Sequence, residues 1–303
     1  MTQRTAIIIL NWNGHEMTAE CIRSVLAMDI QDCHIIVVDN GSTDGSAEIL
    51  PQEFPQITVL RQETNLGFAA GCNVGMRYAL ANGAEYILLL NNDTVVAPDF
   101  LTEMLSAIED DPRIGAVCPK IYFADEPELL WYAGADFSLW TGRFKVRGWR
   151  ELDRGQFGQV REITQATGCA VLARRGALCD VKLFDEQFWA YVEDLDWSIR
   201  FLQRGYRLVF IPKARIWHCD GATAVKSLGS GSQAIRQFLS TRNMVLLARK
   251  HVRWWQLPTY LLGFFVTHIV FYTALRLWRR DFRALIAIYR GLGHGICTSL
   301  QSG

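Results

Sequence analysis

Residues 86–93 read YILLLNND, an aliphatic run that ends abruptly at Asn91, Asn92 and Asp93. A short aliphatic run that stops at polar turn residues is typical of a strand buried on both faces of a parallel sheet. Three earlier runs have the same character: AIIIL (6–10), HIIVVD (34–39) and ITVL (57–60). The four runs predict strands of one parallel sheet.

Stretches with helical spacing separate these runs. Apolar side chains recur at helical intervals over residues 16–28, 69–82 and 99–109. Strands that alternate with helices predict an α/β fold, in which an open, mostly parallel sheet is flanked by helices. In such sheets, ligands bind beyond the carboxyl ends of the strands.

Polar motifs stand at those carboxyl ends. The first run leads into Asn11 and Asn13, the second ends at Asp39, and the fourth ends in the tripeptide 91–93. No GxGxxG follows the first run, and the chain contains no GxxxxGK[ST]. The sequence therefore argues against a dinucleotide-dependent dehydrogenase and against a P-loop enzyme.

The regular alternation is lost in the middle of the chain. Residues 112–165 are rich in aromatic side chains, charges and glycines, and we expect an antiparallel or irregular excursion there. The run GCAVLARR (168–175) predicts that the sheet then resumes.

Three carboxylates follow within four residues, at Glu193, Asp194 and Asp196. They lie among aromatic residues at the start of a predicted short helix that ends at Gly205. Acids in a first helical turn are a common capping pattern, but three exceed what a cap requires. His218 ends the next predicted strand. A lone histidine there is usually a surface residue, but its place after the acids makes it a candidate for the same cleft.

The composition predicts a globular chain with one basic end. Half of the 303 residues are hydrophobic, which excludes an intrinsically disordered protein. Residues 1–100 carry 4 basic and 12 acidic side chains, whereas residues 201–303 carry 15 and 2. These late basic residues flank an apolar stretch, so we expect a membrane surface as partner and no nucleic acid.

The eight cysteines form no CxxC pair, and most lie inside apolar runs. This pattern predicts a reducing compartment, with neither a zinc site nor a disulfide scaffold. The N-terminus has five apolar residues in a row before Asn11, which is too few for a signal peptide. These features predict a cytosolic protein.

The last segment, residues 246–303, is a basic and apolar tail. Residues 254–275 carry no formal charge, and as a helix they would extend about 33 Å, enough to cross a hydrocarbon core. Because basic clusters lie on both sides, a simple span conflicts with the positive-inside rule. We expect a helix interrupted at Pro258, Gly263 and His268 that lies partly inserted in the cytoplasmic leaflet. The alternative is a buried helix of the globular domain.

Seven motifs together resemble the family-2 nucleotide-sugar glycosyltransferases, and most of all the rhamnosyltransferase-type enzymes of bacterial surface polysaccharides. The resemblance covers about residues 5–245 and implies the A-type glycosyltransferase fold, with a Rossmann-like sheet. It implies a catalytic domain over residues 1–245, divided into a nucleotide-binding half (1–111) and an acceptor-binding half (112–245). The motifs are NWNG, VVDNGSTDGS, NLGFAAGCNVG, LLLNNDTVV, GCAVLARR, YVEDLDWSIR and IWH.

The resemblance implies a nucleotide-sugar site at the strand ends. Asp39 matches an aspartate that accepts a hydrogen bond from the pyrimidine ring, and Asn11 and Asn13 match the loop that lines the same pocket. Asn91, Asn92 and Asp93 occupy the position of the family's DxD motif. Asn91 replaces the first aspartate, which removes one negative charge from the implied metal site.

The resemblance also implies a cation and a catalytic base. Asp93, with His218, would bind Mg²⁺ or Mn²⁺ as hard cations that prefer oxygen ligands. The base lies in the acidic pair, where we favour Asp194 over Glu193. Asp196 is expected to cap or orient the helix.

The predicted function is an inverting transfer of a sugar, with rhamnose favoured, from dTDP-rhamnose or a UDP-sugar to a lipid-linked or polysaccharide acceptor. The predicted location is the cytoplasmic face of the bacterial inner membrane. A sugar nucleotidyltransferase is disfavoured because NWNGHEMT (11–18) is not a glycine- and arginine-rich phosphate loop. A non-catalytic membrane-bound scaffold with a degenerate donor site stays the alternative.

Overall fold

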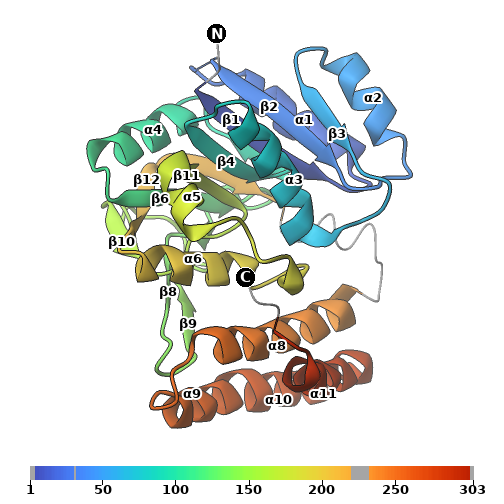
Figure 1. Cartoon of the computed structure of the whole chain (residues 1–303), viewed down its shortest axis with the longest axis vertical. Coiled ribbons are helices and arrows are strands. Elements are labelled where there is room, and N and C mark those ends of the chain that lie inside the picture. Colours follow the sequence, from blue (N-terminus) through green and yellow to red (C-terminus); the bar gives the residue numbers. More distant parts are fainter. Residues whose placement is uncertain (1–3, 31, 220–231, 301–303) are drawn as a thin grey trace.

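A mixed sheet forms the centre of the protein in the computed structural model, which describes residues 4–30, 32–219 and 232–300 (Figure 1). Its main path has the strand order β10-β12-β6-β11-β4-β1-β2-β3. The four strands that come first in the sequence, β1 to β4, are parallel to one another and confirm the four predicted strands. Their bounds are β1 (Thr5–Asn11), β2 (Cys33–Asp39), β3 (Thr58–Arg61) and β4 (Tyr86–Asn91).

Four helices connect and cover these strands. Three match the predicted helical stretches, and their apolar faces are buried against the sheet. The remaining helix, α2, was not predicted, because it contains Pro51 and buries only Ser46 and Leu50. The helices are α1 (His15–Leu26), α2 (Ser46–Glu53), α3 (Gly67–Ala81) and α4 (Phe100–Asp110).

The second half of the sheet is mixed. Strand β11 (Ala170–Arg174) runs antiparallel to both β4 and β6 (Ile114–Phe123), and β6 pairs in parallel with β12 (Arg207–His218). The aromatic segment includes the predicted antiparallel excursion, the hairpin β8 (Ala135–Phe137) and β9 (Phe144–Val146). Three short strands complete the sheet: β5 (Thr94–Val96), β7 (Leu130–Tyr132) and β10 (Arg161–Ile163).

Strand β6 differs from the sequence prediction. Residues 114–123 form a central strand that is buried throughout, although they belong to the segment in which we expected an excursion. Pro119 and Lys120 interrupt the run of apolar residues from which this strand would have been predicted. The Lys120 ammonium is nevertheless buried because it pairs with Asp153 at 2.8 Å, and a buried charge requires such a partner.

Three short helices follow β11. Helix α6 ends just before Gly205, whose φ of +82° provides the left-handed residue that often follows a helix. This end was predicted. The helices are α5 (Arg175–Val181), the 3₁₀ helix η1 (Glu186–Phe188) and α6 (Glu193–Gln203).

The C-terminal helices form a layer of their own next to α6 (Figure 1). Phe188, Leu195 and Ile199 from the α6 region pack with the buried side chains of this layer into a second apolar core. Helix α8 runs without interruption across residue 245, so the expected domain boundary falls inside a helix. The elements are α8 (Ser232–His251), α9 (Leu257–Phe264), the π-helix η3 (Phe265–Val270), α10 (Phe271–Trp278) and α11 (Phe282–Cys297).

Among the described residues, the stretch Leu257–Trp278 is the one helix long and apolar enough to cross a membrane, with a mean hydropathy of 1.5. Only 17% of the 18-residue apolar window within this stretch is buried inside the protein. Pro258 does not interrupt it, because it lies in the first turn of α9, where a helix tolerates proline. The irregularity lies instead at η3, whose ends stay helical. The alternative of a buried core helix does not fit this exposure.

Candidate active site

The carboxyl edge of the parallel strands gathers the polar motifs. Pairing of β1 with β2 sets Asn11 opposite Asp39, and pairing of β1 with β4 sets Leu10 opposite Asn91. Residues far apart in the sequence therefore meet at one edge of the sheet, as parallel pairing requires.

A chain of buried hydrogen bonds runs along this edge. Asn11 Nδ2 donates to Asp39 Oδ2 over 2.9 Å, and Thr18 Oγ1 donates to Asn11 Oδ1 over 2.8 Å. Asn92 Nδ2 in turn donates to Thr18 Oγ1 over 2.9 Å. Asp39 Oδ1 accepts from the backbone of Ser42. Both oxygens of Asp39 thus already have protein partners, and its contact with a nucleobase stays a prediction.

Asn13 joins the loops that follow β1 and β2. Its backbone takes a left-handed conformation, with φ of 51°, which asparagine tolerates better than most residues. Its Oδ1 accepts a hydrogen bond from Thr43 N over 2.7 Å, and its backbone N–H donates to Ser42 Oγ. Asn13 therefore shapes the rim of the edge.

Asp93 and His218 meet at the end of β12. Strand β5 pairs antiparallel with β12, which sets His218 opposite Thr94. The His218 Nε2 atom lies 3.2 Å from Asp93 Oδ1. Both residues are buried, since only 8% of Asp93 and 4% of His218 is exposed. The Trp131 ring meets the imidazole edge-on, with ring centroids 4.8 Å apart. The pair is therefore tightly enclosed.

Asp93 and His218 fit a divalent cation whose remaining ligands come from a bound molecule or from water. Asp93 Oδ1 is buried and contacts His218 Nε2 at 3.2 Å, and the described residues offer it no hydrogen bond beyond that ion pair. A buried carboxylate oxygen with a single such contact has room for a further ligand. Carboxylate oxygen is a preferred ligand of both Mn²⁺ and Mg²⁺, whereas imidazole nitrogen suits a transition metal such as Mn²⁺ better than Mg²⁺. In the described ranges, no three His, Cys, Asp or Glu side chains are arranged so that they could hold a metal ion together, so a cation here needs ligands from a bound molecule or water.

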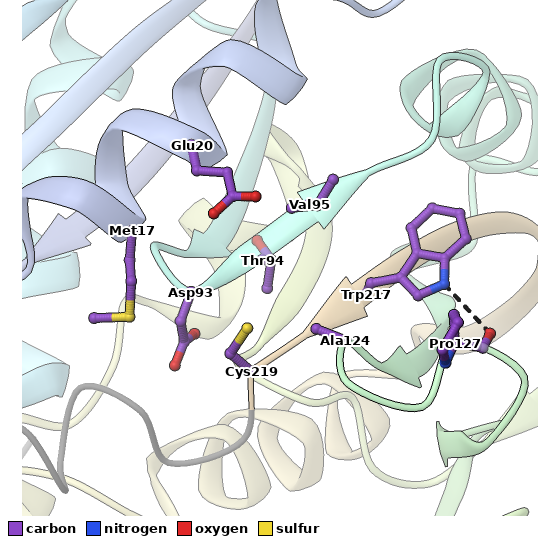
Figure 2. Close-up of a pocket in the computed structure, with 9 residues that line it drawn as sticks. All are labelled: Met17, Glu20, Asp93, Thr94, Val95, Ala124, Pro127, Trp217 and Cys219. Atoms are coloured by element: carbon purple, nitrogen blue, oxygen red, sulfur yellow. Dashed lines mark hydrogen bonds between the residues drawn. The ribbon is translucent and has the colours of Figure 1, made fainter.

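A pocket of about 320 Å³ opens beside Asp93. Figure 2 shows Asp93 and Cys219 side by side, with Met17 and Glu20 of α1 on one side and Trp217 on the other. Asp93 is the residue of the predicted site that lines this pocket. It is therefore both buried against His218 and open to a cavity.

The acidic pair begins α6 after a strained turn. Trp189, Tyr191 and Val192 have φ values of 62°, 68° and 74°, and Val192 is β-branched. Such conformations cost about 1–3 kcal/mol each and persist only where the surroundings enforce them. Here the side chain of Asn243 enforces them. Its Nδ2 lies 2.8, 2.8 and 2.6 Å from the carbonyl oxygens of Phe188, Ala190 and Tyr191.

Asp194 is held in one orientation. Its Oδ2 accepts from Gly168 N over 3.0 Å and from Gln165 Nε2 over 3.1 Å, and its Oδ1 accepts from Leu195 N over 2.8 Å. The side chain is half-buried. Burial raises the pKa of Asp194, and the backbone donors offset part of that rise.

Glu193 has a different environment. Only 5% of the residue is exposed, and its Oε2 has no hydrogen-bond partner. Burial, reinforced by the neighbouring Asp194, raises the pKa of Glu193 well above its ordinary value of 4.5. Glu193 is therefore the carboxyl that more readily keeps its proton.

The residues 168 and 169 join the two parts of the site. Gly168 N donates to Asp194, and Cys169 O accepts from Asn91 N over 2.8 Å. The acidic pair and the motif at the end of β4 are thus connected through two adjacent residues.

The profile described as "Glycosyl transferase family 2" matches residues 6–179, more than half of the chain. The chain belongs to this family. It is a glycosyltransferase.

Curated relatives of this glycosyltransferase include two rhamnosyltransferases. An N-acetylglucosaminyl-diphospho-decaprenol L-rhamnosyltransferase from Mycobacterium tuberculosis is 26% identical over 244 residues, which cover 74% of this chain and 77% of the relative. The dTDP-rhamnosyl transferase RfbF of Shigella flexneri is 26% identical over 73% of this chain and 72% of its own length. The predicted resemblance is confirmed at the level of the family.

Two solved structures share the fold. GalNAc-T7, solved with UDP, GalNAc and Mn²⁺, matches with a TM-score of 0.63 and 17% identity over 81% of this chain and 47% of its own. A mannosyltransferase from Pyrobaculum calidifontis, solved with GDP-Man and Mn²⁺, matches with a TM-score of 0.58 and 15% identity, over 97% and 87% of the two chains. These matches confirm the A-type glycosyltransferase fold.

Asp196 does not cap its helix in this glycosyltransferase. It is fully buried, and its carboxylate contacts Arg200 Nε at 2.8 Å, Lys250 Nζ at 2.8 Å and His251 Nε2 at 2.7 Å. Burial opposes the ionised form, but these partners outweigh it and lower the pKa of Asp196 to about 2. Of the two expected roles, the cap is not observed. The contacts instead hold α6 against α8, because Lys250 and His251 come from that helix, far away in the sequence.

Sequence reasoning also missed the residues that support the site. Asn243 lies within α8, and Gln165 lies in an irregular segment, so neither belongs to a recognisable motif. Thr18 resembles any other polar residue of an amphipathic helix. The one available signal was local: Thr18 follows Asn11 by seven residues, just inside the helix that starts at the strand end.

Proposed function

We propose that this glycosyltransferase transfers rhamnose from dTDP-rhamnose, with inversion, to a lipid-linked acceptor in the synthesis of a cell-envelope polysaccharide. The printed names of two relatives support the sugar, and one of them names a diphospho-decaprenol acceptor. The observation that supports the proposal is the connection through the adjacent residues 168 and 169, of which one is hydrogen-bonded to Asp194 and the other to Asn91 at the end of β4.

Asp194 acts as the general base in this proposal. A base must be ionised and oriented before the reaction, and Asp194 is fixed by three hydrogen-bond donors and partly exposed. The acceptor hydroxyl gives its proton to Asp194 while its oxygen bonds to the anomeric carbon. The bond from that carbon to the diphosphate breaks, and the electron pair leaves with the diphosphate. Glu193 keeps its proton, so Asp194 is the one charged carboxylate of the acidic pair.

Asp93 and His218 would hold the divalent cation. Their buried, adjacent donor atoms support this assignment. A bound cation neutralises the charge that develops on the leaving diphosphate. Asn91 and Asn92 would line the same donor site, and Asp39, Asn11 and Asn13 would shape its nucleotide end.

The C-terminal helices would bring the enzyme to the cytoplasmic face of the membrane. Large apolar side chains are exposed along them, including Trp254 and Trp278, each 80% exposed. Tryptophan is favoured at membrane interfaces, and large exposed apolar surfaces usually mark a binding face. A donor in the cytosol and an acceptor in the bilayer would then meet at this enzyme.

Calorimetric titration tests the donor site. The purified protein is titrated with dTDP, UDP and GDP, each with and without Mn²⁺. We expect dTDP to bind in a Mn²⁺-dependent manner, Asp93→Asn to remove that dependence, and the exposed control Asp110→Asn to leave it intact. Absence of nucleotide binding in the wild-type protein under all conditions would refute the proposal.

Product analysis tests the reaction. The enzyme is supplied with dTDP-rhamnose and a polyprenyl-diphosphate acceptor, and the anomeric configuration of the product is read by NMR. A product of opposite configuration to the donor is expected, and retained configuration would exclude the single displacement.

A further inference from the structure

A second cavity lies between α8 and α11, outside the donor site. It is a groove of about 720 Å³, and Trp189 is one of the residues that line it. Its walls are apolar for most of their length, as at Ile235 and Ile286, and three arginines line it, namely Arg242, Arg283 and Arg290.

The spacing of residues builds this groove from two helical faces. Arg283, Ile286 and Arg290 follow one another at three and four residues on α11, and thus share one face. The helices approach closely because α11 has glycine at the contact. A Cβ atom at Gly291 would lie 2.4 Å from the carbonyl oxygen of Phe238. The close packing of the two helix backbones at Gly291 therefore fixes the two faces that form the groove.

The groove carries positive charge that the described chain does not neutralise. Within residues 232–300 the one acidic side chain is Asp281, which caps α11 through Ala284 N and lies 3.7 Å from Arg276. Arg283 and Arg290 make no ion pair with any described residue, and both are exposed. Uncompensated guanidinium groups beside apolar walls suit a ligand with an anionic head and a hydrocarbon chain.

The position of Trp189 connects this groove to the acidic pair. Its indole packs on Gly67, where a Cβ atom would lie 2.7 Å from the ring, and its carbonyl accepts from Ala69 N over 3.0 Å. Trp189 lies in the strained turn that leads to Asp194. Arg242 of the groove donates to the carbonyl of Phe188 in the same turn. The groove therefore adjoins the turn that carries the proposed base.

We infer that the groove between α8 and α11 binds the polyprenyl diphosphate of the acceptor, with the diphosphate on the arginines and the isoprenoid chain along the apolar walls. This inference rests on the proposed lipid-linked acceptor. The diphosphate is favoured over a phospholipid headgroup because its higher negative charge suits a groove lined by three arginines. Trp189, from the turn before Asp194, also lines the groove, which places the groove next to the proposed base.

Binding of farnesyl diphosphate to the full-length protein in detergent tests the inference. Farnesyl monophosphate and inorganic diphosphate serve as comparison ligands. The double variant Arg283→Gln/Arg290→Gln removes two charges from the groove. The control Arg279→Gln/Arg280→Gln removes two exposed charges from the same tail outside it. Thermal unfolding verifies that both variants are folded.

We expect farnesyl diphosphate to bind at least tenfold more weakly to the groove variant and within twofold of wild type to the control. Farnesyl monophosphate and inorganic diphosphate should each bind more weakly than farnesyl diphosphate. Equal loss in both variants, or no loss in the groove variant, would overturn the inference. So would full displacement of farnesyl diphosphate by phosphatidylglycerol, because the groove would then be a general site for anionic lipid.

Titration with dTDP and Mn²⁺ separates this inference from the proposed function. Both variants should bind dTDP as the wild-type protein does, because the groove lies apart from Asp93. If dTDP fails to bind to the wild-type protein while farnesyl diphosphate binds in the groove, the donor assignment fails and the lipid site stands. The reverse result rejects the lipid site alone.

Discussion

The Nδ2 atom of Asn243 lies 2.6 Å from the carbonyl oxygen of Tyr191, and this contact connects the C-terminal helices to the turn before the acidic pair. Two further carbonyls of the turn share the same amide. The α8 helix, which belongs to the layer with the exposed apolar surface, therefore sets the backbone conformation from which Asp194 projects. Anything that displaces α8 changes the position of the proposed base.

Asn243→Ala should reduce catalysis more than substrate binding. The change removes the amide from three carbonyls, which should cost about 2 kcal/mol or more of folding free energy. A displacement of Asp194 by about 1 Å would lower kcat by about a hundredfold. The measurement is kcat and the KM for the donor, well below the unfolding temperature. Asn82→Ala is the control, because Asn82 also donates to a backbone carbonyl, but at an exposed helix end. A rise in donor KM with unchanged kcat would contradict a positioning role.

Asp194→Asn should lower kcat by about 10² to 10⁴-fold, the range that general-base catalysis contributes. The asparagine Oδ1 can still accept from Gly168 N, so the fold should be retained. Glu193→Gln should keep most of the activity, because an amide replaces a carboxyl that is already protonated. The two rates are compared by sugar transfer at saturating donor. A larger loss in Glu193→Gln than in Asp194→Asn would reverse the assignment of the base.

The pH dependence of stability should report on Glu193. Its pKa is raised in the folded protein, so its contribution to stability is complete below its ordinary pKa of 4.5 and is lost as the pH rises through the folded-state pKa. Glu193→Gln should therefore be more stable than wild type at neutral pH, with a difference that grows from pH 4.5 upward. Denaturant unfolding at several pH values measures it. A difference that is independent of pH would show that Glu193 is not buried as a protonated acid.

Asn91→Asp should strengthen the binding of Mn²⁺ in the presence of dTDP by about tenfold or more, because it adds a negative charge beside Asp93. The same charge should lower the unfolding temperature without metal, since two carboxylates would then repel each other. Calorimetry and thermal unfolding measure the two effects. Asn82→Asp makes the same charge change at a distant exposed position and should have neither effect. Unchanged Mn²⁺ affinity would argue that the motif at the end of β4 does not bind the cation.

Asp196→Asn should destabilise the protein by about 3–5 kcal/mol at neutral pH, because it leaves Arg200 and Lys250 without their buried anion. The pKa of Asp196 is lowered to about 2, so its stabilisation is present above its ordinary pKa and is lost as the pH falls from about 4 to 2. The difference from wild type should shrink over that interval. Denaturant unfolding, with the exposed Asp125→Asn as control, measures this. A constant difference would exclude the ion pairs as its source.

The first half of the fold followed from local sequence patterns. The four parallel strands and three of the helices around them could be predicted because each has its own hydrophobic period and turn residues. Helix α2 and strand β6 could not. Helix α2 buries too few side chains to show a period, and the pattern of β6 is broken by Lys120, whose burial depends on Asp153 in a distant loop.

The candidate site divides in the same way. The residues at the strand ends could be predicted because the carboxyl edge of a parallel sheet is a fixed place for ligands. The partners of those residues could not. Asn243 supports the turn through backbone carbonyls, which have no side-chain signature in the sequence. Trp189, Tyr191 and Val192 take left-handed conformations that glycine would have indicated and that their own residue types do not.

By itself, the sequence determined the class of fold, the order of the motifs and the apolar character of the tail, because these depend on residues close together in the chain. The tertiary structure alone decided that α8 holds the turn before Asp194, that Asp196 joins α6 to α8, and that Trp189 lines a groove together with three arginines. Each of these depends on side chains tens of residues apart. Their meeting is set by the packing of whole helices, and no local period in the sequence records it.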